Sequence, residues 1–229
     1  MTGLACDSCP VRDRAACASL APEERAELER IGRHRSFKRG ETIFAAGDND
    51  PMCATLIAGA LKIASYDADG VERILALVHP AGFVGEMFAP VAHHHIVALT
   101  DSKLCCFSRK DYERAISAFP ALAGALLRRS AEDLHQSRAL IDLMGRRSAD
   151  ARVAGLLMAF ARAASDSPCH PAQRFDLPLT RGEMAGLLGL TIETVSRQLG
   201  KLEADGLIRR AGSRGIEIAN AARLEAITR

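Results

Sequence analysis

The chain has 229 residues, of which 48% are hydrophobic and 25% charged, and its formal net charge is +2. This length allows two folding units with separate cores, and the small net charge does not by itself indicate a polyanionic ligand. No apolar run approaches the roughly 20 residues of a membrane span, and the N-terminus lacks the apolar stretch of a signal peptide. We therefore expect a cytoplasmic protein with no membrane partner. In that reducing compartment its seven cysteines are expected to be metal ligands or redox groups rather than disulfides.

The first two thirds of the chain alternate between helical and β-rich patterns. Residues 1–20 form a cysteine-bearing arm that is too brief to fold alone, and a short helix is expected after Pro22. Residues 36–108 consist of short apolar segments punctuated by glycine, which is typical of the many short strands of a β-sandwich or roll. A short helix over 111–117 is predicted to end this region.

A long helix is predicted from Pro120 to about Met144. Along it, apolar and small residues repeat at alternating spacings of three and four, the heptad pattern of helices that pack in parallel pairs. The stripe predicts a homodimer, and the alternative is that it packs on the β-roll of its own chain. Its members are Leu127, Ser130, Leu134, Ser137, Ile141 and Met144.

A helix-turn-helix pattern occupies the basic last third of the chain. Thr180 and Glu183 form a capping box, in which each side chain satisfies a free backbone amide at the start of a helix. Gly189 allows a tight turn, and Thr191 caps a second helix that runs from 192 to about 205. Two short helices joined across a glycine turn are therefore expected.

The same region predicts a wing and a set of base-reading side chains. Strands are expected over 175–179, 207–210 and 215–218, and the last two form a hairpin whose arginines can meet phosphate. Glu193 and Arg197 lie one helical turn apart and can read adjacent cytosine and guanine bases, although an ordinary surface ion pair is the alternative. The expected contacts to double-stranded DNA are Thr180, Arg181, Thr191, Glu193, Thr194, Ser196, Arg197 and Lys201.

The string LTRGEMAGLLGLTIETVSRQLGKLEADGLI, with RGETIF, AGD and the long central helix before it, resembles the CRP/FNR superfamily of dimeric bacterial transcription regulators. The resemblance implies an α+β fold with an N-terminal cyclic-nucleotide-binding-like β-roll (jelly roll), a long central dimerisation helix and a C-terminal winged helix-turn-helix. It also implies an activator that contacts RNA polymerase and is not an enzyme. Glu193, Ser196 and Arg197 match the E-x-x-S-R pattern of the FNR branch, which implies palindromic TTGAT-type sites. The expected domains are the arm 1–20, the β-roll 21–118, the dimerisation helix 119–145 and the DNA-binding domain 146–229.

Three thiols on the arm, Cys6, Cys9 and Cys17, need a fourth soft ligand to complete a tetrahedral or cubane site. Cys105 and Cys106 end a predicted strand, where adjacent side chains point to opposite faces, so only one of them can face the arm. The segment LCCFSRK resembles the place of the distant cysteine in oxygen-sensing FNR-type proteins, which favours Cys105 with Cys106 as the alternative. The resemblance implies a [4Fe-4S] cluster that is dismantled by oxygen, while spacing alone leaves a structural zinc or a redox dithiol open.

The β-rich region has two alternative functions, a cyclic-nucleotide sensor and a metalloenzyme. Gly85-Glu86 matches part of the phosphate cassette of CRP-like nucleotide sensors, but residues 93–96, HHHI, stand where that cassette has an arginine and a small hydroxyl residue. A cupin-like metalloenzyme is disfavoured because consecutive strand residues alternate faces, so the three histidines are expected in an exposed loop. Cys53 and Cys169 are expected to be buried or loop thiols with no role.

Overall fold

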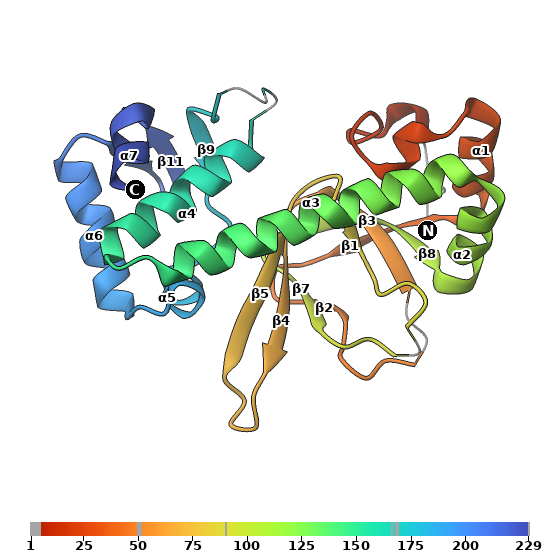
Figure 1. The fold of residues 1–229 in the computed structure, drawn as a ribbon, viewed down its shortest axis with the longest axis horizontal. Helices are drawn as coiled ribbons and strands as arrows, with labels where there is room; N and C mark the ends of the chain where they lie inside the picture. The colour runs from red at the N-terminus through yellow and green to blue at the C-terminus, as the bar shows by residue number, and fades with distance from the viewer. Residues whose placement is uncertain (1–5, 50–51, 90, 166, 168–169, 229) are drawn as a thin grey trace. The chain divides into compact units, whose positions relative to one another are not determined.

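A computed structural model gives the structure of the protein and describes residues 6–49, 52–89, 91–165, 167 and 170–228. Cys169 lies outside these residues. The chain divides into two compact units, one up to Ser137 and one from Arg138 (Figure 1). The boundary falls within the long helix α3 (Pro120–Gly145), and each unit is described by itself.

The arm folds into short turns and ends in a helix. It contains two 3-10 turns, η1 (Cys6–Ser8) and η2 (Ala16–Ser19), which are followed by the helix α1 (Pro22–Ile31). Proline at the first position suits a helix start, and the Glu24 carboxylate accepts a hydrogen bond from the Ala21 amide at 2.9 Å. The helix predicted after Pro22 is thus present.

Two four-stranded antiparallel sheets make up the β-roll, with strand orders β1-β8-β3-β6 and β2-β7-β4-β5. The strands are β1 (Arg33–Phe37), β2 (Thr42–Phe44), β3 (Met52–Ala58), β4 (Leu61–Tyr66), β5 (Glu72–Val78), β6 (Phe83–Val84), β7 (His95–Ala98) and β8 (Ser102–Ser108). Leu56, Leu61 and Leu104 are 0% exposed and belong to the core between the sheets. The predicted β-roll is confirmed.

Two helices follow the roll in direct succession. The first, α2 (Arg109–Ala118), begins two residues before the expected 111–117 because the Ser108 hydroxyl caps it, accepting a hydrogen bond from the Asp111 amide at 3.1 Å. The second, α3, begins at Pro120 as expected. The side chain of Leu122, in the first turn of α3, is 0% exposed and packs with Leu20 and Tyr112.

The large apolar side chains of the heptad stripe of α3 are exposed to solvent. Leu127 is 73% exposed, Leu134 51%, Ile141 66% and Met144 41%. Leu127 and Leu134, which lie in the same unit as the β-roll, therefore do not pack on it, which was the alternative to dimerisation. Of the two serines in the stripe, Ser130 is exposed and Ser137 is half-buried.

The second unit packs helices around a small three-stranded sheet with the order β10-β11-β9. Its elements are α4 (Ala149–Ala163), β9 (Arg174–Asp176), α5 (Arg181–Leu188), α6 (Ile192–Ala204), β10 (Ile208–Ala211), β11 (Gly215–Ile218) and α7 (Ala221–Ile227). The strand expected over 175–179 ends at Asp176, since Pro178 has no amide to donate to a sheet. The sequence reading missed α7, whose signal is Asn220: its side chain accepts a hydrogen bond from the Arg223 amide at 3.0 Å.

No helix within the described part of the chain is both long enough and apolar enough to span a bilayer.

Candidate functional sites

The helix-turn-helix is built by the side-chain caps that the sequence predicts. The Thr180 hydroxyl accepts from the Glu183 amide at 3.1 Å, and the Glu183 carboxylate accepts from the Thr180 amide at 2.7 Å. Gly189 ends α5 with a left-handed backbone, φ 61°, which glycine adopts without steric cost. The Thr191 hydroxyl then caps α6, accepting from the Thr194 amide at 3.2 Å. These contacts fix where α6 begins.

One face of α6 is buried and the opposite face carries the predicted base-reading side chains. Val195 and Leu199 are 0% and 4% exposed, which anchors the helix to its own unit. Glu193 and Arg197 are exposed, and no ion pair joins them in the described chain; the Arg197 guanidinium instead donates to the Thr194 hydroxyl at 3.4 Å. The surface-pair alternative is therefore not what the structure shows. Both charged groups remain accessible to a ligand.

Some of the other predicted contacts are engaged within the protein. The hydroxyls of Thr180 and Thr191 serve as helix caps, and Arg181 donates to the Ser196 hydroxyl at 3.2 Å. Lys201 lies 3.6 Å from the Asp150 carboxylate. These side chains remain on the surface beside Glu193 and Arg197, and their partners hold them in defined orientations.

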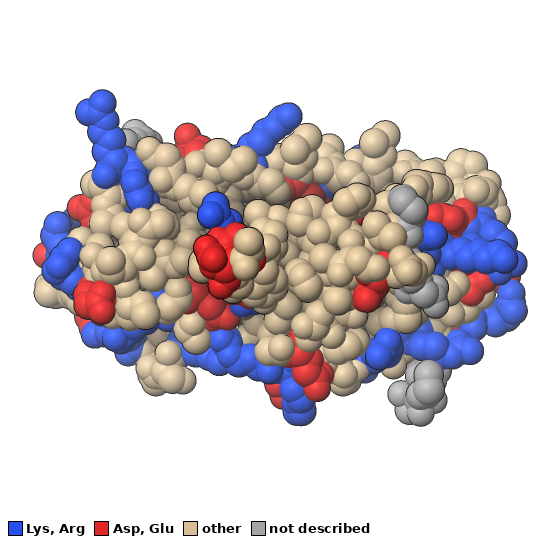
Figure 2. Space-filling model, turned by 90° about the horizontal axis from the view of Figure 1, so that it is seen from below, with Lys and Arg blue, Asp and Glu red and all other residues tan. Residues whose placement is uncertain are grey.

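Two arginines of the basic C-terminal region have internal roles that the sequence did not reveal. The Arg152 guanidinium donates to the carbonyls of Arg146 and Leu188 at 2.8 and 3.1 Å. The Arg210 guanidinium binds the Glu203 carboxylate, and its side chain stays 36% exposed. Figure 2 shows exposed Lys and Arg side chains over the C-terminal unit, at its left, and also over the N-terminal unit.

A further exposed residue of α6 was missed in the sequence. Ile192 begins the helix and is 52% exposed, beside Glu193. An apolar side chain at this edge can contact the methyl group of thymine. The signal was available, since the inward stripe of α6 is complete without it.

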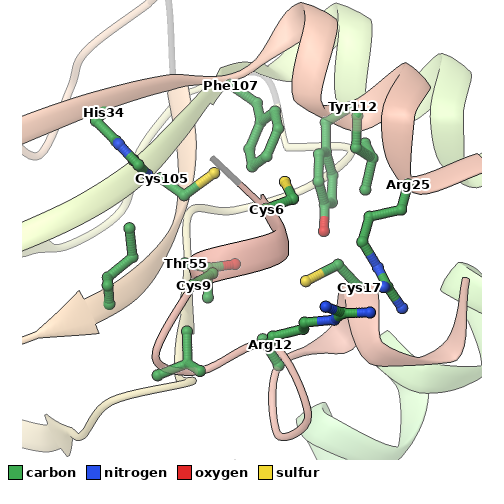
Figure 3. A pocket seen from close by; sticks show the side chains of 14 residues that line it. Cys6, Cys9, Arg12, Cys17, Arg25, His34, Thr55, Cys105, Phe107 and Tyr112 are labelled. Atoms are coloured by element: carbon green, nitrogen blue, oxygen red, sulfur yellow. The ribbon is translucent and has the colours of Figure 1, made fainter. Parts of the chain in front are cut away.

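A pocket in the first unit is lined by all four cysteines predicted as ligands, Cys6, Cys9, Cys17 and Cys105 (Figure 3). We call it the thiol pocket. Other side chains that line it are Arg12, Arg25, His34, Thr55, Phe107 and Tyr112. The arm thus lies against β8, although nearly the whole β-roll separates the two in the sequence.

The strand pleat separates the two adjacent cysteines of β8. Cys105 stands opposite His34 of β1 and Thr55 of β3, and both of these neighbours also line the thiol pocket. Cys106 is 3% exposed and lies in the β-roll core. Cys53 is likewise buried, 1% exposed, with its Sγ 3.9 Å from the Phe107 carbonyl.

Burial and mutual proximity make thiolate formation unfavourable in this pocket. Burial, aided by Glu29 and by the Cys17 and Cys9 thiols, raises the pKa of Cys6 to about 11. The pKa of Cys17 is raised by burial and by Cys9, and that of Cys105 by burial and by Cys6 and Cys17. Such thiols are protonated at neutral pH and become thiolates when a cationic metal centre binds them.

The donor set consists of thiols, which are ligands of zinc ions and of iron-sulfur clusters. A tetrahedral zinc with Zn–S bonds of about 2.3 Å needs its sulfur atoms roughly 3.8 Å apart. Within the described residues, no group of three or more His, Cys, Asp and Glu side chains is arranged to hold one metal ion. A four-iron cluster takes one thiolate at each of four iron atoms and so accepts thiols spread around a pocket. The Tyr112 side chain, 1% exposed, also points its hydroxyl into the space among them (Figure 3).

The carboxylate that matches part of a nucleotide cassette is occupied from within the chain. Glu86 accepts hydrogen bonds from the His93 amide at 3.1 Å and from His94 Nδ1 at 3.2 Å, and it also contacts His93 Nδ1. These contacts lower the pKa of Glu86 against the effect of its burial. Of the three histidines expected in an exposed loop, His95 is instead half-buried in β7. The Glu86 carboxylate is thus engaged by the histidines that follow it in the chain.

A β-roll, a long helix and a winged helix-turn-helix together define a DNA-binding transcription regulator. Residues 34–119 match the family described as cyclic nucleotide-binding domain, and residues 151–227 match the Crp-like helix-turn-helix domain. The chain is 37% identical to the transcriptional activator protein FnrL of Cereibacter sphaeroides over 96% of this chain and 90% of that protein. It is 32% identical to the nitrogen fixation regulation protein FixK of Bradyrhizobium diazoefficiens, over 98% of this chain and 94% of that protein.

The chain belongs to the CRP/FNR family of transcription regulators. The solved structure of FixK2 from Bradyrhizobium japonicum superposes with a TM-score of 0.78 at 26% identity, covering 87% of this chain and 98% of that one. Members of the family regulate transcription by binding double-stranded DNA as dimers, and they are not enzymes. The predicted family, fold class and DNA-binding role are confirmed.

Proposed function

We propose that this protein is a homodimeric transcription activator that senses oxygen through a [4Fe-4S] cluster held by Cys6, Cys9, Cys17 and Cys105. With the cluster intact it binds palindromic TTGAT-type sites and contacts RNA polymerase in the cytoplasm. The observation that carries the proposal is the meeting of three arm thiols and the Cys105 thiol of β8 in one pocket. Similarity to a transcriptional activator, FnrL, along almost the whole chain supports the activator role.

The identity of the bound group is inferred from the family resemblance. All four ligands are soft thiols, which a zinc ion and an iron-sulfur cluster both accept, and the resemblance of the LCCFSRK segment to oxygen-sensing FNR-type proteins favours the cluster. When bound, the cluster supplies an oxygen-labile link between the arm and β8. These four bonds would add to the apolar contacts of Val11, Ala15 and Leu20, which are buried in the first unit.

The arm is connected to the start of the dimerisation helix. The Ser19 hydroxyl lies 3.1 Å from the Ala121 carbonyl, and Leu20 packs in one cluster with Leu122. Cys17 is only two residues before Ser19, so a change in how Cys17 is held is transmitted directly to the first turn of α3. This gives a physical route from the thiol pocket to the dimer interface within one unit.

The interface itself is the exposed stripe of α3. Leu127, Leu134, Ile141 and Met144 present apolar surface to solvent on one helix, at the spacing of a parallel pair. The two serines among them limit the buried apolar area. A dimer of modest stability is one whose equilibrium the loss of the arm contacts can shift.

In the dimer, two α6 helices read the two halves of a palindrome. The exposed Glu193 and Arg197 carry an acceptor for cytosine and a bidentate donor for guanine, and Ser196 lies between them. Recognition helices about one DNA turn apart match a palindromic site. The E-x-x-S-R pattern supports a TTGAT-type half-site.

Anaerobic purification tests the proposal. The protein should be brown and contain four irons and four sulfides per protomer, with visible absorption that is lost in air. Operator affinity should fall in parallel, as measured by fluorescence anisotropy. A colourless protein without iron that binds the operator equally well with and without air would overturn the proposal. Zinc in place of iron would overturn oxygen sensing by a cluster and assign the same four thiols a structural role.

A further inference from the structure

Arg25 places an unpartnered donor at the thiol pocket. It lies in the first half of α1, lines the pocket, and its Nη2 donates to the Leu20 carbonyl at 3.1 Å. Its Nε is buried and has no hydrogen-bond partner among the described residues. A buried N–H without an acceptor is rare in a folded protein, because its loss of water is not compensated. Because Arg25 also lines the thiol pocket, a group bound there could supply the missing acceptor.

The charged side chains nearest the thiol pocket include two guanidinium groups, with the Glu29 carboxylate on the Cys6 side. No ion pair to a carboxylate is formed by Arg25 within the described chain, whereas Arg30 on the same helix pairs with Glu27 at 2.6 Å. Arg12 brings a second guanidinium to the same side of the pocket, near Cys17 (Figure 3). Its carboxylate partner, Asp7, is 3.6 Å away with a side chain that is 96% exposed. Two guanidinium groups beside the thiols suit an anionic occupant.

We propose that Arg25 is a positioning residue for the cluster: its Nε–H donates to a sulfur atom on the Cys17 side, and its charge offsets that of the bound group. The inference rests on the proposed function, since a cluster with four thiolates is the anion required. Charge and hydrogen bonds to sulfur are the features that set the potential and stability of such clusters. The hydrogen bond from Nη2 to Leu20 also ties the end of the arm to α1.

The geometry also explains why lysine would be a poor replacement. An arginine side chain can direct Nη2 to a carbonyl and Nε to a second acceptor at the same time, because its donors are fixed in one plane. A lysine ammonium supplies the charge but cannot span both acceptors in this way. The two properties of Arg25, charge and fixed direction, can therefore be tested separately.

The test uses the full-length protein reconstituted without oxygen. Arg25→Met removes charge and donors at similar length, Arg25→Lys keeps the charge, and Arg30→Met on the exposed face of α1 is the matched control. The readouts are iron and sulfide content, the rate of iron transfer to a chelator in the absence of oxygen, and the midpoint potential of the cluster. Thermal melts of the metal-free proteins report whether the fold is intact.

We expect Arg25→Met to release iron about tenfold faster than the wild type and to shift the midpoint potential negatively, by about 59 mV for a tenfold change in stabilisation. Arg25→Lys should restore part of the shift in midpoint potential but little of the resistance to the chelator, and Arg30→Met should match the wild type.

A wild-type rate of iron release and a wild-type midpoint potential in Arg25→Met would overturn the inference while leaving the proposed function intact. Absence of iron from the wild type itself would overturn both. If metal-free Arg25→Met melts at a lower temperature than the wild type, Arg25→Lys is compared with Arg30→Met instead. Equal rates of iron release in these two variants would overturn the inference.

Discussion

Cys105 and Cys106 are neighbours on β8, yet their side chains serve different parts of the molecule. Cys105 lines the thiol pocket with the arm cysteines, and Cys106 is 3% exposed in the core between the sheets. The pleat of a strand is the cause, since successive side chains leave opposite faces. The two positions are therefore a natural pair for separating ligation from packing.

We predict that Cys105→Ala abolishes cluster assembly and that Cys106→Ala preserves it. The first substitution removes one of four ligands, and the second removes a small buried side chain at a cost of about 1 kcal/mol in the free energy of unfolding. Iron and sulfide content after anaerobic reconstitution, together with urea denaturation, measures both effects. Full cluster content in Cys105→Ala, or its loss in a folded Cys106→Ala, would show that the assignment of the fourth ligand is wrong.

The parts of this structure that local rules govern could be predicted from the sequence. The capping box of Thr180 and Glu183 forms as expected, because both partners lie within one helical turn and need no other contact. The same holds for the opposite orientations of Cys105 and Cys106. The heptad stripe likewise marked the face of α3 that is exposed in this chain.

What could not be predicted depends on partners distant in the sequence or in the fold. Arg152 looks like any basic residue near a DNA-binding helix, but its acceptor is the Leu188 carbonyl at the end of α5. Arg210 is paired with Glu203, seven residues away across a turn. The orphan Nε of Arg25 has no sequence signature either, since it is defined by what the folded arm does not supply.

For the dimer, we predict that Leu134→Glu separates the protomers and that His135→Glu does not. Leu134 belongs to the exposed stripe of α3, whereas His135 is exposed one position outside it. Two buried glutamates per dimer would raise the dissociation constant by roughly 100-fold or more, because each loses leucine burial and carries a charge into apolar surroundings. Sedimentation velocity of the anaerobic proteins measures this. The melting temperature of dilute protomers should be unchanged, since the side chain is exposed in the single chain.

A pH effect on stability is expected from His79. Burial and the nearby Arg129 lower the pKa of His79 from 6.5 to about 4. Between these values the unfolded chain binds a proton that the folded chain does not, so the free energy of unfolding falls as the pH drops from about 6.5 towards 4. The expected loss is on the order of 2 kcal/mol.

His79→Gln should remove this part of the pH dependence. The comparison is made as a difference from the wild type, because Asp133, which faces the same Arg129, has its pKa raised by burial and acts in the opposite direction. Urea denaturation at pH 7 and pH 4.5 gives the required values, with the exposed His135→Gln as control. Parallel pH profiles for the wild type and His79→Gln would contradict the assignment.

On DNA, base reading and phosphate contact should respond differently to substitution. Arg197→Ala removes a bidentate donor to guanine and should weaken operator binding by about 1–3 kcal/mol per half-site while relaxing the preference at that base pair. Arg209→Gln, in the wing, should weaken binding to operator and unrelated DNA alike, and should reduce the slope of log K against log salt by about 1 per protomer. Arg209 suits this comparison because its side chain is 75% exposed and its ion pair with Glu217 is long, at 3.9 Å, whereas Arg210 is bound to Glu203. Anisotropy titrations at several salt concentrations, on an operator and on its variant at the guanine position, separate the two effects. An Arg197→Ala protein that keeps its full discrimination between those two sites would move base reading away from α6.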